Sequence, residues 1–221
     1  MCGIVGAVAE RNIANILLEG LKRLEYRGYD SAGLTVIRDG ELHRERQVGK
    51  VQALVDAVEA STDFFDGHIG IAHTRWATHG EPAQRNAHPH ISGKIAVVHN
   101  GIVENYAELK KELIAKGYAF TSQTDTEVVA HLIHDIYEQT NDLLEAVRAV
   151  IPKLHGAFAL GIIHVDTPDE LVAVRLGSPL VIGVGIGENF IASDQLALLP
   201  VTNRFMYLEE GDIAKLTRDS I

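Results

Sequence analysis

The chain opens with Met1-Cys2-Gly3-Ile4-Val5-Gly6-Ala7-Val8-Ala9-Glu10, and this stretch decides what fold to expect. The small apolar residues at positions 3–9 are typical of a buried strand, so a strand begins almost at the first residue. The stretch breaks at Glu10 and Arg11 and lacks the basic region of a signal peptide. No run of about 18 apolar residues follows that could cross a membrane. We therefore expect a cytoplasmic protein built around an N-terminal strand.

The bulk composition is that of an ordinary globular domain. The 221 residues are 46% hydrophobic and 23% charged. A chain of this length buries enough surface to fold without disulfide cross-links. The formal net charge of −10 argues against a nucleic-acid or anionic-membrane surface, which would need a basic patch. Because there is one cysteine, no intramolecular disulfide can form.

Hydrophobic patterning divides the chain into a mixed part and a strand-rich part. Up to residue 154, spacings of three and four residues predict helices at 13–24, 51–60, 105–116, 127–138 and 142–154, the first with Asn12 as N-cap. Apolar runs in the same part predict strands at 33–38, 41–46, 69–74 and 95–99. From residue 156 onward, short runs predict antiparallel strands at 157–165, 170–176, 180–184, 190–193, 204–208 and 212–217. This order is typical of a layered α+β domain and not of a βαβ repeat.

Two connections and the chain end carry further information. Asp39-Gly40 between two strand runs predicts a hairpin. The segment 78–92, rich in Thr, His, Gly, Pro and Asn, is too long and polar for a tight turn, so we interpret it as a functional loop. The chain stops at Arg218-Asp219-Ser220-Ile221, close behind a predicted strand. We expect it to be truncated from a longer chain with further domains.

The single cysteine, Cys2, gains a chemical role if Met1 is removed. Cys2 then carries a thiol and a free α-amine on one residue. An α-amine has a pKa of about 7.7–8.0, so near neutral pH it can accept the thiol proton. While Met1 remains, the same nitrogen is an amide and cannot act as a base. By position alone, a small buried residue that opens a strand is the simpler interpretation of Cys2.

Five groups of residues place Cys2 in a chemical context. They are Cys2-Gly3-Ile4-Val5-Gly6, Arg23-Leu24-Glu25-Tyr26-Arg27-Gly28-Tyr29-Asp30-Ser31-Ala32-Gly33, His73-Thr74-Arg75-Trp76-Ala77-Thr78-His79-Gly80, His99-Asn100-Gly101-Ile102-Val103-Glu104-Asn105 and Thr124-Asp125-Thr126-Glu127. In this order and spacing the chain resembles the class II glutamine amidotransferases, whose nucleophile is N-terminal. Within them it resembles the glutaminase domain of the branch that forms glucosamine 6-phosphate. The resemblance runs from Cys2 to the end of the chain.

Asn100 and Gly101 follow a predicted strand and have two interpretations. Attack of a thiolate on an amide creates a tetrahedral oxyanion, which needs preorganised donors. The side-chain amide of Asn100 and the backbone N–H of Gly101 can supply two, and glycine allows the backbone to come close. Asn-Gly is also the commonest hairpin signal, and without the resemblance a turn would be favoured. The resemblance implies the oxyanion hole.

Arg75 and Asp125 match the charges of free glutamine. A site that buries the α-carboxylate and the α-ammonium must pair both. Arg75 can meet the carboxylate in a bidentate fork, and the resemblance implies that Asp125 meets the ammonium. The simpler interpretations are a surface salt bridge for Arg75 and an N-cap of the following helix for Asp125.

The remaining candidates lie near the nucleophile or in the polar loop. Trp76, Thr78 and His79 resemble the family's glutamine loop, which closes over the substrate, and in the family this tryptophan gates the passage of ammonia. Core packing is the alternative for Trp76, the only tryptophan. The resemblance implies that Arg27 helps to shape the nucleophile's pocket, although Gly28-Tyr29-Asp30 is equally consistent with a structural turn.

The eleven histidines raise the question of a metal. His88-Pro89-His90 and the pair His131 and His134 are the best candidates, but a zinc site needs three or four convergent ligands and no cysteine is left to contribute. We expect no metal, and we expect His88 and His99 to orient loops by hydrogen bonding. No glycine-rich phosphate-binding motif precedes a helix, so no nucleotide or other cofactor is predicted.

The resemblance implies a four-layer αββα fold of the N-terminal-nucleophile hydrolases, in which two antiparallel sheets lie between helices. Residues 1–221 are then a single glutaminase domain that hydrolyses L-glutamine to L-glutamate and ammonia through a Cys2 thioester. The ammonia is expected to serve sugar-phosphate isomerase domains of the same parent chain, which convert fructose 6-phosphate to glucosamine 6-phosphate. The full-length enzyme is expected to be a homo-oligomer without nucleic-acid or membrane partners.

Two alternatives stay open. The same half-reaction serves other acceptors in amidophosphoribosyltransferase, asparagine synthetase and glutamate synthase, although residues 26–33 and 75–80 favour the glucosamine-phosphate branch. A non-catalytic regulatory module with the same fold is the second alternative. Such a module is expected to have lost Cys2, Asn100 or Asp125, and the chain retains all three.

Overall fold

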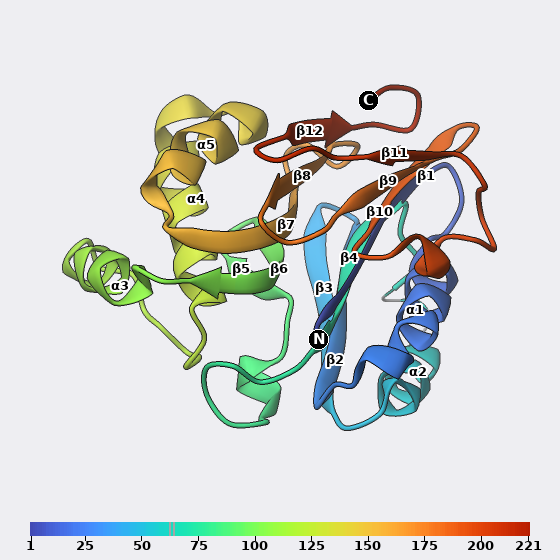
Figure 1. The fold of residues 1–221 in the computed structure, drawn as a ribbon, viewed down its shortest axis with the longest axis horizontal. Coiled ribbons are helices and arrows are strands. Elements are labelled where there is room, and N and C mark those ends of the chain that lie inside the picture. The colour runs from blue at the N-terminus through green and yellow to red at the C-terminus, as the bar shows by residue number, and fades with distance from the viewer. Residues whose placement is uncertain (62, 64) are drawn as a thin grey trace.

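Two antiparallel sheets pack against each other in the computed structural model, which describes residues 1–61, 63 and 65–221 (Figure 1). Among these residues the larger sheet has seven strands in the order β11-β9-β10-β1-β4-β2-β3. The smaller has five in the order β12-β8-β7-β6-β5. The strands of the larger sheet are β1 (Gly3–Ala9), β2 (Ser31–Arg38), β3 (Glu41–Val48), β4 (Ile69–Arg75), β9 (Val181–Val184), β10 (Glu188–Ala192) and β11 (Phe205–Tyr207). Those of the smaller are β5 (His90–Ser92), β6 (Ile95–Val103), β7 (Gly156–His164), β8 (Leu171–Leu176) and β12 (Ile213–Leu216).

Helices cover the outer face of each sheet. Two of them, α1 (Ala14–Arg23) and α2 (Val51–Glu59), pack on the seven-stranded sheet, whereas α3 (Tyr106–Ala115), α4 (Thr126–Thr140) and α5 (Leu143–Val150) lie on the five-stranded side (Figure 1). Separate apolar clusters fill the two helix–sheet interfaces and the space between the sheets. The predicted four-layer αββα arrangement is therefore confirmed. No helix in the described part of the chain is long and apolar enough to span a membrane.

The N-terminal strand lies at the centre of the larger sheet. β1 pairs with β10 on one side and β4 on the other, and all seven of its residues are buried. Val5 and Ala7 face the helix-side cluster, whereas Ile4 and Val8 face the cluster between the sheets. A strand with apolar layers on both faces needs an uninterrupted apolar run, which is why the first ten residues predicted it.

Most predicted elements appear with shifts at their ends. The hairpin turn is at Asp39 and Gly40, whose positive φ values of 51° and 75° fit an Asp-Gly turn. The Asn12 side chain accepts a hydrogen bond from the N–H of Ala14 at 2.9 Å, and the helix begins at Ala14. The predicted helix at 142–154 ends as an α-helix at Val150 and continues as a 3₁₀ turn, Ile151–Lys153.

Two predictions near the site need correction. The segment 78–92 is not entirely a loop, because its last three residues form β5, which pairs with the first residues of β6. Three residues are too few for a hydrophobic period to appear. The strand predicted at 95–99 continues to Val103, so Asn100 and Gly101 lie inside β6, opposite Ala159 and Phe158 of β7. The hairpin-turn interpretation of Asn100-Gly101 is therefore wrong.

Candidate active site

The candidate residues meet where the start of β1, the end of β4 and the end of β6 come together. The register of β1 with β4 pairs Gly3 with Thr74, which brings Cys2 beside the residues that follow Thr74. An open cavity of about 430 Å³ is lined by several predicted residues, namely Cys2, Arg27, Trp76, Thr78, Asn100 and Gly101. A smaller cavity of about 10 Å³ is lined by the rest, Arg75, His79 and Asp125, again with Cys2. The fold thus gathers all nine predicted residues around one thiol.

The Cys2 thiol is held against the backbone of Trp76. The Trp76 N–H donates to Sγ at 3.2 Å, and Sγ lies 3.6 Å from the Trp76 carbonyl oxygen, to which the thiol donates. Burial raises the pKa of this thiol, while the N–H bond from Trp76 and the nearby N-terminal ammonium oppose the rise. A thiol with a raised pKa is protonated near neutral pH, so it needs a base before it can attack.

The N-terminus itself lies beside Arg27. The Met1 ammonium donates to the Arg27 carbonyl oxygen at 2.8 Å. The Arg27 guanidinium donates to the hydroxyl of Ser193 at 3.0 Å and to the Cys2 carbonyl oxygen at 3.5 Å. The Arg27 main chain thus holds the Met1 ammonium and its side chain holds the Cys2 carbonyl. Gly28 provides the positive φ of 76° that ends the 3₁₀ turn Glu25–Arg27.

Asn100 and Gly101 face the cavity from β6. The Asn100 side-chain Nδ2 donates to the Cys2 carbonyl oxygen at 3.2 Å. Gly101 has φ of 111°, and a Cβ built there would lie 2.0 Å from the Ala157 carbonyl oxygen of β7. Only glycine fits at this position, and its backbone therefore reaches the cavity wall unobstructed.

Arg75 is buried, with 3% of its surface exposed, so the surface salt-bridge interpretation is wrong. Its guanidinium donates to three consecutive carbonyl oxygens of the following loop, those of His79, Gly80 and Glu81, the last two at 3.2 Å. Asp30 lies 3.7 Å away and supplies the opposite charge. Arg75 therefore organises the loop that encloses the smaller cavity.

Asp125 stands at the N-cap position of α4 but does not cap it, because its side chain makes no capping bond. One carboxylate oxygen instead accepts the N–H of Val103 at the end of β6, at 2.8 Å. The other lies 3.9 Å from Nδ1 of His79. With 4% of its surface exposed, this carboxylate faces the smaller cavity and not solvent.

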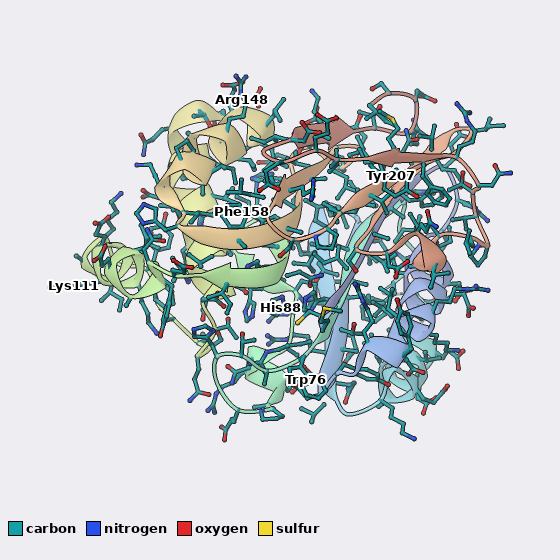
Figure 2. The ribbon with its side chains drawn as sticks, in the orientation of Figure 1. Trp76, His88, Lys111, Arg148, Phe158 and Tyr207 are labelled. Atoms are coloured by element: carbon teal, nitrogen blue, oxygen red, sulfur yellow. The ribbon has the colours of Figure 1, made fainter. Side chains whose placement is uncertain are left out.

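The loop after β4 presents the other candidates. Trp76 is 54% exposed, so it is not a core residue, and its ring lies over Gly28. The Thr78 hydroxyl lies 3.3 Å from Nδ1 of His79, and the His79 ring meets Tyr106 edge-on. In Figure 2, His88 lies near the middle of the view, between the two sheets, and Trp76 lies below it.

Several supporting residues were not singled out by the sequence. Asp30 accepts the N–H of Ala77 at 2.5 Å and pairs with Arg75 at 3.7 Å, so it helps to hold the loop after β4. The Thr126 hydroxyl at the start of α4 lies 2.9 Å from Nδ1 of His99 and 3.3 Å from Nε2 of His88, so these histidines tie β6 and the loop before β5 to this helix. Asp30 and Thr126 both lie inside the quoted motifs, so the motifs were the only signal for them. No group of three or more potential metal ligands converges in the described residues.

The comparisons with known proteins decide the family. A family model described as a glutamine amidotransferase domain matches residues 73–200. The chain belongs to the glutamine amidotransferase family. Over all of its length it is 72% identical to the glutamine–fructose-6-phosphate aminotransferase (isomerizing) of Acinetobacter baylyi and 61% identical to that of Escherichia coli K12. It spans 36% of the length of each of these relatives.

Solved amidotransferase structures have the same fold. The glutamine phosphoribosylpyrophosphate amidotransferase of B. subtilis, complexed with ADP and GMP, superposes with a TM-score of 0.82 at 27% identity. That match covers 98% of this chain and 47% of the other. A structure titled as the allosteric regulatory enzyme of purine biosynthesis matches with a TM-score of 0.83 at 26% identity over the same shares. The N-terminal-nucleophile amidotransferase architecture is therefore that of this chain.

Proposed function

We propose that this chain hydrolyses the side-chain amide of L-glutamine to L-glutamate and ammonia, with the Cys2 thiolate as nucleophile. The observation that carries the proposal is the convergence of the Cys2 thiol, the Asn100 amide and the Gly101 backbone on one cavity. A thiol and two neighbouring hydrogen-bond donors are what acyl transfer from an amide requires.

The reaction begins once Met1 has been removed, which frees the α-amine of Cys2. This amine takes the thiol proton, because burial keeps the thiol pKa raised and the sulfur protonated. The thiolate adds to the amide carbon of glutamine, and the oxyanion is stabilised by Asn100 and Gly101. The C–N bond then breaks, and ammonia leaves with the proton held by the Cys2 ammonium. Water hydrolyses the γ-glutamyl thioester to glutamate and restores the thiol.

Arg75 and Asp125, which line the smaller cavity beside Cys2, pair with the charges of free glutamine. Arg75 supports the α-carboxylate and Asp125 the α-ammonium, because these two side chains are the buried opposite charges that line it. Trp76, Thr78 and His79 form the loop that closes over the substrate and keeps bulk water from the thioester. Arg27 shapes the pocket by holding the Cys2 carbonyl.

For the whole protein we propose the activity named for its relatives, transfer of the ammonia to fructose 6-phosphate to give glucosamine 6-phosphate. Residues 1–221 are then the glutaminase domain of a longer chain whose sugar-phosphate isomerase domains accept the ammonia. The support is that this chain is 72% identical over its whole length to a relative of which it spans only 36%. We place this protein in the cytoplasm as a homo-oligomer without nucleic-acid or membrane partners.

The test is glutamate release from glutamine by the Met1-free chain, compared with the Cys2→Ala variant. We expect release by the parent chain, its loss in Cys2→Ala, and unchanged thermal unfolding of the variant. A parent chain with confirmed loss of Met1 that releases no glutamate identifies a non-catalytic module. In the full-length protein, ammonia transfer to 5-phosphoribosyl pyrophosphate instead of fructose 6-phosphate contradicts the proposed acceptor.

A further inference from the structure

We propose that His73 is a positioning residue for the oxyanion hole: it holds the side-chain amide of Asn100 with its N–H toward Cys2. The inference rests on the proposed glutaminase function, in which Asn100 stabilises the oxyanion. His73 lies on β4 in the larger sheet and Asn100 on β6 in the smaller one, so this contact crosses between the sheets at the active-site end.

The hydrogen bonds of His73 assign its tautomer. Its Nε2 lies 2.9 Å from the His99 carbonyl oxygen. Because a backbone carbonyl can only accept, Nε2 must carry the hydrogen. The same nitrogen lies 2.9 Å from the side-chain oxygen of Asn100, which therefore also accepts from it.

This tautomer in turn assigns the orientation of the Asn100 amide. A donor at Nε2 attracts the amide oxygen and repels the amide nitrogen, so Nδ2 must point away from His73. Away from His73 is toward the nucleophile, and Nδ2 donates to the Cys2 carbonyl oxygen at 3.2 Å. An amide turned by half a rotation would present its oxygen to the developing oxyanion, where the partial negative charge of the amide oxygen and the charge of the oxyanion repel.

The surroundings keep His73 in one orientation and one charge state. Its ring is fully buried and stacks on His88, with centroids 4.0 Å apart and an interplanar angle of 12°. Burial lowers the pKa of His73 to about 3, so the imidazole stays neutral throughout the physiological range. The ring is therefore a fixed donor, which is the preorganisation that an oxyanion hole needs.

Replacing His73 should reduce the chemical step and leave substrate binding nearly unchanged. Removal of one oxyanion donor typically costs about 10²- to 10³-fold in kcat, and a donor that remains but is free to rotate should cost less. We expect His73→Leu to lower kcat for glutamine hydrolysis by about 10- to 100-fold, with KM within about twofold of the parent value. His73→Gln, whose amide can again donate toward Asn100, should recover most of the loss.

The experiment compares these variants in the parent and in the Asn100→Ala background. If His73 acts through Asn100, His73→Leu costs less than about twofold once Asn100 is already Ala. His164→Gln is the matched control, because His164 is also a buried neutral histidine but stacks on Tyr137 away from the site. Equal losses of kcat in both backgrounds, or a loss confined to KM, would overturn the proposal.

A measurement on the unsubstituted chain tests the tautomer of His73 without an activity assay. The ¹⁵N NMR spectrum of the His73 ring should show hydrogen on Nε2 and none on Nδ1. The opposite tautomer overturns the proposal even if the His73→Leu variant fails to fold. A parent chain that does not hydrolyse glutamine contradicts the proposed function, whereas an active parent with full activity in His73→Leu contradicts only the role of His73.

Discussion

Asp125 occupies the N-cap position of α4, but its side chain makes its contacts elsewhere. It stands where an aspartate commonly caps a helix, yet its carboxylate turns to the N–H of Val103 and the ring of His79. The buried carboxylate of Asp125 and the guanidinium of Arg75 both line the smaller cavity. In the function proposed above, this carboxylate pairs with the α-ammonium of glutamine.

We predict that Asp125→Asn raises KM for glutamine by roughly 10- to 100-fold, the effect of losing a hydrogen bond to a charged group. The fold should persist, because an asparagine oxygen can still accept the N–H of Val103. Steady-state kinetics and thermal unfolding check both parts.

The matched control is Asp142→Asn at the start of α5. Asp142 does cap its helix, accepting the N–H of Glu145 at 3.0 Å, and it lies on an exposed surface. The Asp142→Asn substitution should lower the stability slightly and leave KM for glutamine unchanged. If Asp125→Asn behaves like Asp142→Asn, then Asp125 has only a structural role.

At the residue scale, the spaced motifs identified more of the candidate site residues than capping and salt-bridge rules alone could. Cys2, Arg75 and Asp125 were found because they lie in spaced motifs, while capping and salt-bridge rules gave other interpretations. Asp30 and His73 were missed as functional residues, although both lie in the same motifs. Their roles depend on contacts across strands, Asp30 with Ala77 and His73 with Asn100, and no local pattern reports such contacts.

At the scale of elements, the continuation of β6 through Asn100 and Gly101 creates the site. The sequence predicted the strand to end at residue 99, because Asn-Gly is a strong turn signal. Pairing with β7 overrides this signal and keeps both residues in the sheet as far as Val103. The turn preference of Asn-Gly is therefore overridden at the place where the backbone lines the cavity beside Cys2.

We predict that Gly101→Ala destabilises the chain by at least about 2 kcal/mol more than Gly117→Ala. Both glycines have positive φ, of 111° and 97°, so both substitutions strain the backbone. A Cβ at Gly101 also collides with the Ala157 carbonyl at 2.0 Å, whereas Gly117 has nothing within 4 Å. Urea unfolding of the two variants separates the steric collision from the backbone strain. Equal losses of stability would show that β6 and β7 do not approach closely enough at Gly101 to exclude a Cβ.

At the scale of the whole molecule, packing two sheets together buries a group of histidines behind the site. His73, His88, His90 and His99 are all buried, and the His88 ring contacts the rings of the other three. Burial lowers the pKa of His73 and His90 to about 3, and it also lowers the pKa of His88 and His99. The layers were predictable from the order of apolar runs, but this clustering arises from loops and strands far apart in sequence.

These lowered pKa values predict loss of stability in mild acid. An unfolded histidine binds a proton near pH 6.5, whereas the folded ones stay neutral to about pH 3, so the unfolded state binds more protons between these values. The free energy of unfolding should therefore fall as pH drops below about 6.5, by up to about 1.4 kcal/mol per pH unit for each such histidine. Urea unfolding at pH 7.5 and pH 5.0 measures the difference.

A variant at an exposed histidine, His155→Gln, should leave this pH dependence unchanged, whereas His90→Gln should reduce it. The buried Glu127, whose pKa is lowered to about 2, contributes little between pH 7.5 and pH 5.0, because its stabilisation is lost only as pH falls below the unfolded carboxyl pKa of about 4.3. Equal free energies of unfolding at the two pH values would mean that the buried histidines are not neutral in the folded chain.

Under the proposed mechanism, Cys2 becomes the nucleophile only when Met1 is gone. The most direct test is the intact mass of a mixture of chains with and without Met1, quenched with acid during turnover of glutamine, followed by mapping of the N-terminal peptide. We predict one added glutamyl group on Cys2, confined to molecules that begin at Cys2. A glutamyl group on molecules that retain Met1, or on any residue other than Cys2, would contradict the role of the freed Cys2 amine.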